Sequence, residues 1–299
     1  MTSGIKLENL DTTAVRGADF YQYACGGWMA AHPLTDEYSR FGSFDYLAET
    51  TREQLNGLIG EIAAGEHAQG TVAQKIADLY NLAMDTAKLN AEGMAPIKAD
   101  FDRIAAIKTP AEVLEAMVEL QGGAYFQFYV GADIMDSKNN IFELYQGGIG
   151  LGEKEYYTDE DEATKNIREE YKKHIVKMFQ LAGMDEAQAT KSMEAVMEIE
   201  TRLAKVSYSA VEQRDPAANY HKMTLDELKK EIPGFDWDAY LNKLGVQGVT
   251  SLNVAQIPPV KEAVAIINTL PMDKQIAYLQ WKLIDSAASY LSADFDEQN

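Results

Sequence analysis

The sequence has few of the residues that crosslink a chain or hold a metal ion. Its 299 residues include a single cysteine, Cys25, so no disulfide can form within the chain and no site can be built from several cysteines. The chain has four histidines, His32, His67, His174 and His221. None of them has another histidine three to five residues away, and a helical zinc site needs two ligands on one face of the helix. The sequence therefore contains no local zinc site.

Long apolar runs are also missing. No stretch reaches about eighteen apolar residues, so we expect no helix that spans a membrane. The first thirteen residues have neither a basic region nor an apolar core, so they do not have the pattern of a signal peptide. A cytoplasmic protein fits this sequence, and so does a periplasmic or cell-envelope protein from which a signal segment was removed.

Positive charge is scarce. The chain has 27 Lys and Arg against 47 Asp and Glu, which gives a formal net charge of −20 at pH 7. Such a chain repels phosphate backbones and anionic membrane surfaces, and no local cluster of Lys and Arg offsets the repulsion. Nucleic acid is therefore not an expected partner. The hydrophobic share of 46% and the charged share of 25% are typical of a globular protein with a sizeable core.

Most of the chain has the periodicity of helices. Apolar side chains recur three and four positions apart, or cap signals mark a helix start, at 71–89, from 109 onward, at 160–183, 185–208, 258–269 and 271–291. Thr109 and Glu112 have the spacing of a capping box, and Gly122-Gly123 is expected to end the helix that begins there. Thr224 and Glu227 repeat that spacing. The chain stops at residue 299, soon after the last predicted helix, and we expect that it is truncated.

One segment has the pattern of strands instead. Residues 124–134 are dense in aromatic side chains, and the short apolar stretch 141–145 follows a polar turn expected at 136–140. We therefore expect a small β-hairpin over about 124–146. The alternating glycines of 147–152 lack the Gly-Lys-Ser/Thr ending of a phosphate-binding loop, so we expect no nucleotide there. The fold class predicted is mainly α with one hairpin.

The residues alone give no complete active site. There is no Gly-x-Ser-x-Gly elbow, and Cys25 has no base beside it. Glu170 and His174 lie four apart on a predicted helix, where we expect a surface ion pair rather than a metal site. The most distinctive stretch is 19–47, which collects Cys25, Gly26-Gly27, Trp28 and an Arg before Phe-Gly in under thirty residues.

This stretch resembles the opening of the neprilysin and endothelin-converting-enzyme family of zinc metallopeptidases. The matching residues are Asp19-Phe20, Tyr23-Ala24-Cys25-Gly26-Gly27-Trp28 and Ser39-Arg40-Phe41-Gly42-Ser43-Phe44-Asp45. Later stretches also resemble the family: Gly150-Leu151-Gly152 with Tyr156-Tyr157, Arg214-Asp215-Pro216 with Tyr220-His221-Lys222-Met223-Thr224, and Trp281 with Asp285. The chain is identified as the N-terminal, non-zinc portion of a bacterial-type member.

The resemblance implies a multi-helical cap domain that ends before a thermolysin-like catalytic domain. We expect an N-terminal arm over 1–18 and a helical N-terminal peptidase domain over 19–299, incomplete at its C-terminal end. The full-length enzyme would bind zinc through His-Glu-x-x-His and a later glutamate, none of which is in this chain. The expected partners are an oligopeptide substrate and the catalytic domain of the same protein. The isolated chain is expected to hold no catalytic residue and to be inactive.

The resemblance also assigns substrate-binding residues. Arg40 would reach the C-terminal carboxylate of the peptide, because a guanidinium offers a planar fork to a planar carboxylate. Phe44 and Asp45 would line the pockets for residues that follow the scissile bond. From the residues alone, Arg40 could instead form a salt bridge with Asp45 or Asp36, and Phe44 could simply pack.

The other residues of the same stretch are expected to be structural. In animal members the cysteine of this motif forms a disulfide with the catalytic half; here we expect Cys25 to be a free buried thiol. The Gly26-Gly27 pair is expected to permit a tight turn, and Trp28 to fill the domain junction.

Two other functions fit parts of the sequence. A non-catalytic helical module that binds peptides or a protein agrees with the acidity and the missing metal site, whereas the motif matches in order along the chain disfavour it. A purely structural helical scaffold explains the helices and leaves the composition of residues 19–47 without a reason.

Overall fold

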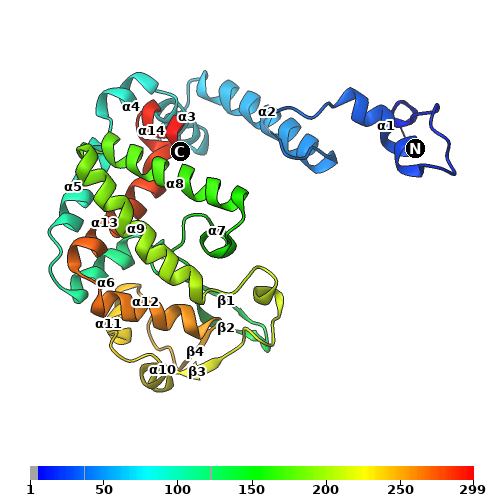
Figure 1. Ribbon diagram of the computed structural model, residues 1–299. Helices are drawn as coiled ribbons and strands as arrows, with labels where there is room; N and C mark the ends of the chain where they lie inside the picture. The colour runs from blue at the N-terminus through cyan, green and yellow to red at the C-terminus, as the bar shows by residue number, and fades with distance from the viewer. Residues whose placement is uncertain (1–5, 37, 122) are drawn as a thin grey trace. The chain divides into compact units, whose positions relative to one another are not determined.

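The computed structural model describes residues 6–36, 38–121 and 123–299. Residues 1–5 of the predicted arm, Glu37, and Gly122 of the pair expected to end a helix lie outside the described residues. The chain forms two compact units, Met1–Met84 and Asp85–Asn299, and each is described by itself. Figure 1 labels the helices and strands. The predicted division into an arm over 1–18 and a domain over 19–299 stays a prediction.

Within its described part, the first unit has helices and no strand. It contains the 3₁₀ turn η1 (Leu7–Asn9) and the helices α1 (Phe20–Ala31), α2 (Ser43–Ala63) and α3 (Val72–Ala83). Two of these helices begin where a side chain caps the free backbone amides: Asp19 accepts from the amide of Gln22, and Thr71 from that of Gln74. The η1 turn packs on α1, and α2 packs on α3.

Gly26 and Gly27 lie inside helix α1, so the expected tight turn is wrong. A Cβ built at Gly27 would collide with the backbone oxygen of Glu8, and one at Gly26 would lie 2.7 Å from Cβ of Asp11. The two glycines are needed because residues 8–11 run directly against this face of α1.

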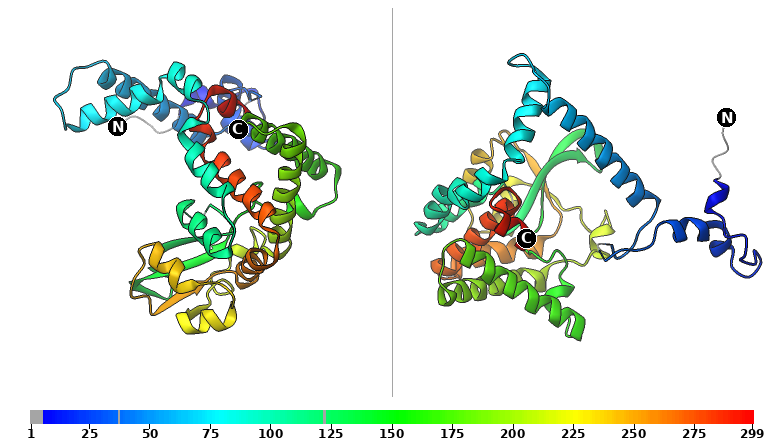
Figure 2. Two further views of the ribbon diagram at one scale, coloured as in Figure 1. Left: turned by 90° about the vertical axis from the view of Figure 1, so that its left-hand side faces the viewer. Right: turned by 90° about the horizontal axis from the view of Figure 1, so that it is seen from above.

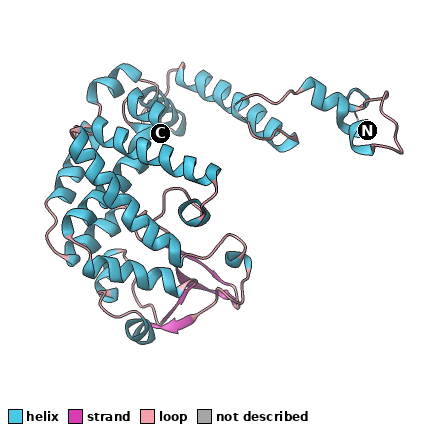
Figure 3. Cartoon of the chain, viewed as in Figure 1, coloured by secondary structure: helices cyan, strands magenta, loops and turns pink. Residues whose placement is uncertain are grey.

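The second unit contains most of the fold. Its helices are α4 (Thr86–Glu92), α5 (Ala95–Ala105), α6 (Pro110–Glu119), α7 (Glu155–Thr158), α8 (Glu162–Leu181), α9 (Glu186–Val206), α10 (Leu225–Glu231), α11 (Trp237–Lys243), α12 (Ile257–Thr269), α13 (Met272–Ala287) and α14 (Ala293–Gln298), with 3₁₀ turns η2 (Glu212–Arg214) and η3 (Ala288–Tyr290). The prediction of a mainly helical chain is confirmed (Figure 3).

Local capping explains where several helices begin. Thr109 and Glu112 exchange the hydrogen bonds of a capping box at the start of α6, and Thr224 does the same with Glu227 at α10, as predicted. The predicted helix 71–89 is instead two helices, α3 and α4, because the Asp85 carboxylate caps a new helix there. The helix predicted over 271–291 ends at Ala287.

The predicted hairpin is confirmed, and it belongs to a larger sheet. Strands β1 (Phe126–Asp133) and β2 (Asp136–Gln146) pair antiparallel, and the order of the four-stranded sheet is β1-β2-β4-β3. The turn predicted at 136–140 is wrong, since Asp136 already pairs with Asp133. Strands β3 (Lys222–Thr224) and β4 (Ser251–Val254) were not predicted; β4 runs parallel to β2. The long β1–β2 strands are seen in the right-hand view of Figure 2.

Two apolar clusters hold the second unit together. One joins the sheet to α6, α11 and α12 through fully buried side chains such as Phe126, Leu144 and Trp237. The other joins α8, α9 and α13 around Trp281, with Phe179 and Val196. Helix α13 contributes to both clusters, since Tyr278 lies in the first and Trp281 in the second.

Candidate functional site

The residues assigned to substrate binding lie together where the chain enters helix α2. Arg40 stands in the loop before the helix, and Phe44 and Asp45 are in its first turn. All three line one pocket of about 270 Å³, whose wall is made by residues 40–45. Since the wall is one continuous stretch of the first unit, the local backbone alone brings these side chains together.

Asp45 has a structural task that explains the start of α2. Its carboxylate accepts a hydrogen bond from the backbone amide of Gly42 at 2.8 Å. A carboxylate in the first turn also suits the positive end of the helix dipole. No other described residue forms a hydrogen bond with the second carboxylate oxygen of Asp45. The contact of Asp45 with a substrate stays a prediction.

Arg40 and Phe44 have exposed side chains that hold no other described residue in place. The Phe44 side chain is 85% exposed, so among the described residues it does not pack. The Arg40 side chain is exposed as well, and no ion pair joins it to Asp36, to Asp45 or to any other described residue. The salt bridge that the residues alone could suggest is therefore not formed.

A cluster of ring contacts includes the Phe41 and Tyr38 side chains of the Arg40 loop. Trp28 stacks on His32 with ring centroids 4.4 Å apart, and Phe41 stacks on Trp28 at 6.0 Å. Tyr46 meets the edge of His32 at 5.2 Å, and Tyr38 meets Phe41 at 5.1 Å. Trp28 thus packs on rings inside the first unit, and the expectation that it fills a domain junction stays a prediction. The helical spacing of Trp28 and His32, four apart, was the sequence signal for the cluster.

Cys25 lies on helix α1 and is half-buried. That its thiol stays free in the whole protein remains a prediction. The helical neighbours of Cys25 include Gly26, the position that residues 8–11 approach closely.

The Gly150-Leu151-Gly152 motif belongs to a buried polar network in the second unit. Glu200 is completely buried and forms an ion pair of 2.9 Å with Lys282, which is 6% exposed. The hydroxyls of Tyr157 and Tyr171 both donate to the other oxygen of Glu200, at 2.6 Å and 3.0 Å. Burial raises the pKa of each of these two tyrosines, so both stay protonated donors.

This network fixes the motif loop. The backbone amide of Leu151 donates to the Tyr157 hydroxyl at 3.0 Å, and a Cβ at Gly150 would collide with the Tyr171 hydroxyl. Gly150 is therefore required for the loop to reach Tyr171. The motif therefore has a structural task, and the network that holds it joins α7, α8, α9 and α13.

The expected ion pair between Glu170 and His174 is wrong. Glu170 pairs with Lys173 at 2.7 Å instead. His174 is half-buried against the edge of Trp281, with centroids 5.5 Å apart, and its Nδ1 meets the Gln298 amide at 3.2 Å. Burial lowers the pKa of His174, which suits a neutral ring packed on α13.

A second buried carboxylate ties the hairpin to β3. Asp133 is 1% exposed and binds the Tyr220 hydroxyl at 2.9 Å and the Lys222 ammonium at 2.8 Å. The hydrogen bond from Lys222, with that from the Met135 amide, lowers the pKa of Asp133 to about 2. Tyr220 and Lys222 come from the third motif of the sequence, so this motif too has a structural task.

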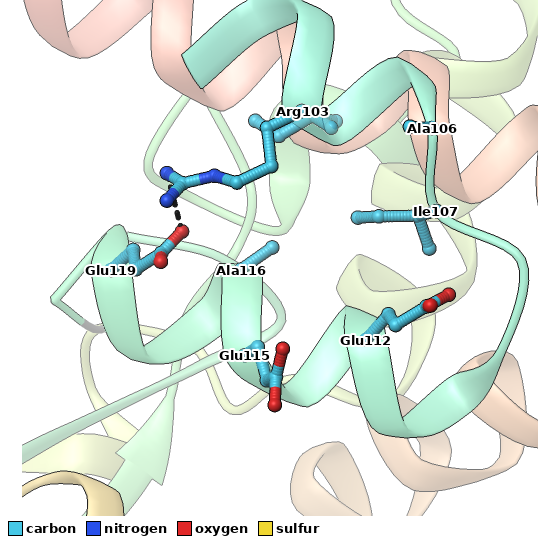
Figure 4. Close-up of a pocket in the computed structure, with 8 residues that line it drawn as sticks. Arg103, Ala106, Ile107, Glu112, Glu115, Ala116 and Glu119 are labelled. Carbon is cyan, nitrogen blue, oxygen red and sulfur yellow. Dashed lines mark ion pairs between the residues drawn. The ribbon is translucent and has the colours of Figure 1, made fainter. Parts of the chain in front are cut away.

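The pocket between α5 and α6 carries no reactive arrangement. It holds about 200 Å³, and its lining includes three carboxylates and the apolar side chains of Ile104 and Ile107. Figure 4 shows Glu112, Glu115 and Glu119 around it. Each of these three carboxylates already forms an ion pair or caps a helix. Glu119 pairs with Arg103 at 2.6 Å, Glu115 pairs with Lys243 at 2.9 Å, and Glu112 caps α6.

Within the described part of the chain, no group of three or more His, Cys, Asp or Glu side chains could hold a metal ion. The described residues therefore do not offer a set of ligands that fits zinc. None of the helices in residues 6–36, 38–121 and 123–299 is both long and apolar enough to cross a membrane.

Comparison with known proteins gives a consistent set of relatives. Residues 17–299 match the model of peptidase family M13. Endothelin-converting enzyme 1 of Rattus norvegicus is 27% identical over 316 residues, covering 99% of this chain and 40% of that protein. The Homo sapiens enzyme is 26% identical over 312 residues, with 99% and 40% covered. The chain thus spans about two fifths of the length of these relatives.

Two solved structures show the same fold. The Mycobacterium tuberculosis zinc metalloprotease ZMP1, in complex with an inhibitor, matches with a TM-score of 0.90 and 27% identity, over 99% of this chain and 46% of that one. PEPO from Lactobacillus rhamnosis HN001 matches with a TM-score of 0.75 and 20% identity, over 94% and 45%. The second match is evidence for the fold alone.

Proposed function

The chain belongs to peptidase family M13, and on that premise we propose that it is the substrate-enclosing N-terminal part of a zinc-dependent metalloendopeptidase that hydrolyses oligopeptides. The names of the relatives support this, since they are an endothelin-converting enzyme and a zinc metalloprotease. Because the chain spans about two fifths of the curated relatives, we assign the zinc ligands and the bond-breaking groups to a C-terminal catalytic domain of the same protein.

Within that enzyme, the task of this chain is binding. Arg40 anchors the C-terminal carboxylate of the peptide, while Phe44 and Asp45 line the pockets for the residues after the scissile bond. The observation that carries the proposal is the uncommitted Arg40 guanidinium, which is exposed in the 40–45 pocket and has no described ion-pair partner.

The physical basis is a charge-assisted, two-pronged hydrogen bond. An Arg–carboxylate pair of this kind contributes about 1.5–3 kcal/mol to the free energy of binding. A peptide that ends in an amide has no charged carboxylate and cannot form this pair. The exposed Phe44 ring offers an apolar surface beside it. Asp45, which caps α2 through one oxygen, can accept from a peptide N–H through the other.

The test is Arg40→Ala in the full-length enzyme, assayed on two peptides that differ only in a free or an amidated C-terminus. We expect KM for the free-acid peptide to rise roughly tenfold to hundredfold, and KM for the amide to stay unchanged. Arg52→Ala is the matched control, because Arg52 is also exposed and unpaired among the described residues, on α2. Equal effects on both peptides would remove the carboxylate anchor.

The alternative, a non-catalytic module that binds peptides, predicts a different gene sequence. It requires that the reading frame encode no catalytic domain beyond residue 299, whereas our proposal requires a His-Glu-x-x-His segment there. Sequencing the gene through this point separates the two.

A further inference from the structure

The loop that carries Arg40 contacts helix α1 through stacked rings. We call Trp28, His32, Tyr38, Phe41 and Tyr46 the ring cluster. Phe41, the residue after Arg40, lies parallel to Trp28 within 13° at 6.0 Å and parallel to His32 within 22° at 6.4 Å. Stacks and edge contacts at these distances stabilise a pair of rings beyond the area that they bury.

The ring contacts of His32 with described residues reach three segments. The ring stacks on Trp28 of α1 at 4.4 Å, lies parallel to Phe41 of the loop, and receives the edge of Tyr46 from α2. Its Nδ1 meets the backbone oxygen of Trp28 at 2.8 Å, which fixes the plane of the ring. Without this ring, the Trp28–Phe41 stack remains as the described ring contact from α1 to the loop.

Two hydrogen bonds hold the loop on either side of Arg40. The Tyr38 hydroxyl donates to Glu49 at 2.7 Å, and the Gly42 amide donates to Asp45 at 2.8 Å. Arg40 lies between them, next to the stacked Phe41, and its own side chain stays exposed and unpaired among the described residues. A backbone held in place that carries a free guanidinium is typical of a pre-organised binding residue, since less conformational freedom is lost when the ligand binds.

We propose that His32 is a positioning residue for substrate binding: through the ring cluster it holds residues 38–42 so that Arg40 meets the peptide carboxylate. The inference rests on the proposed function of Arg40 and adds the residue on which selectivity for free-acid peptides depends. His32 touches no substrate in this account. It acts through Phe41 and the backbone of the loop.

The experiment uses the full-length enzyme and the same pair of free-acid and amidated peptides. His32→Ala is expected to raise KM for the free acid roughly three- to tenfold, the range of one lost ring stack, with kcat and both constants for the amide unchanged. His32→Phe keeps a planar ring and is expected to restore most of the selectivity. His67→Ala is the matched control, because His67 meets Ile62 at the other end of α2 and should change nothing.

A double-variant cycle separates positioning from simple stabilisation. In an Arg40→Ala background, His32→Ala is expected to give no further rise in KM for the free acid. Phe41→Leu serves as a second route to the same result should His32→Ala fail to fold, since it removes the loop ring that stacks on Trp28 and His32 and leaves the Trp28–His32 stack.

The outcomes distinguish the two proposals. Equal KM changes for acid and amide in His32→Ala, or an unchanged KM for the acid while Arg40→Ala raises it, would overturn the positioning role and leave the carboxylate anchor intact. An Arg40→Ala enzyme without acid-selective loss would overturn both.

Discussion

Removing the Lys282 ammonium is expected to destabilise the second unit more than any surface charge change. Lys282 and Glu200 are 6% and 0% exposed, and their ion pair of 2.9 Å joins α13 to α9. Lys282→Met keeps the length and the apolar stem of the side chain and leaves Glu200 buried without its cation. Breaking one half of a buried pair costs about 3–5 kcal/mol.

The structure favours the lower end of that range. The hydroxyls of Tyr157 and Tyr171 still donate to Glu200 in the variant, so the carboxylate keeps two of its hydrogen bonds. We therefore expect a loss of about 3 kcal/mol in the free energy of unfolding. For a unit of this size that loss lowers Tm by roughly 6–12 °C.

The assay is thermal unfolding followed by circular dichroism, with hydrogen exchange of peptides from α9 and α13. Lys173→Met is the matched control, because both side chains of the Lys173–Glu170 pair are exposed, and an ion pair in water adds little to stability. The double variant Glu200→Gln with Lys282→Met removes both charges and is expected to recover part of the loss. A Lys282→Met protein as stable as Lys173→Met would refute the reasoning.

Two further changes test other parts of the fold. Gly27→Ala puts a Cβ against the backbone oxygen of Glu8 and should lower the free energy of unfolding by roughly 1–3 kcal/mol, whereas Gly57→Ala, with open space around it inside α2, should raise it by about 0.5–1 kcal/mol. Hydrogen exchange in 7–31 and urea unfolding check both variants, and equal effects would contradict the packing argument. The pKa of Asp133 is lowered to about 2 in the folded chain, mainly by the hydrogen bond from Lys222. The ionised carboxylate therefore stabilises the fold fully at pH values above the unfolded pKa of about 3.9, and this stabilisation is lost as pH falls toward 2. Between pH 5 and pH 2, urea unfolding should show a smaller fall in the free energy of unfolding for Asp133→Asn than for the native chain. The same pH dependence in both proteins would contradict this role of Asp133.

Structure set by near neighbours could be predicted from the sequence. The capping pairs Thr109–Glu112 and Thr224–Glu227 lie three residues apart, so the starts of α6 and α10 were visible in the pattern. The β1–β2 hairpin was visible for the same reason, because its strands are long and adjacent in the chain.

Structure set by distant contacts could not be predicted. Strands β3 and β4 have three and four residues, too few to show a period, and they form because β4 pairs with both β2 and β3. Glu200 and Lys282 are 82 positions apart, and nothing local marks either as buried. Gly26 and Gly27 looked like a turn because their steric reason, the chain at residues 8–11, comes from outside their helix.

The candidate site shows the same division. Arg40, Phe44 and Asp45 were selected by resemblance to a family, since their types alone allowed a salt bridge or ordinary packing. The capping role of Asp45 could have been read from its place three residues after Gly42. The contacts of His32 with Phe41 and Tyr46 needed the fold, because they bring two helices and a loop together.

The most direct measurement of the central claim is a crystal structure of the full-length enzyme with a bound product peptide that carries a free C-terminus. We expect the terminal carboxylate about 2.7–3.0 Å from the Arg40 guanidinium, with the zinc ion held entirely by residues beyond 299. A carboxylate bound elsewhere, with Arg40 paired to an acidic side chain of its own protein, would contradict the account.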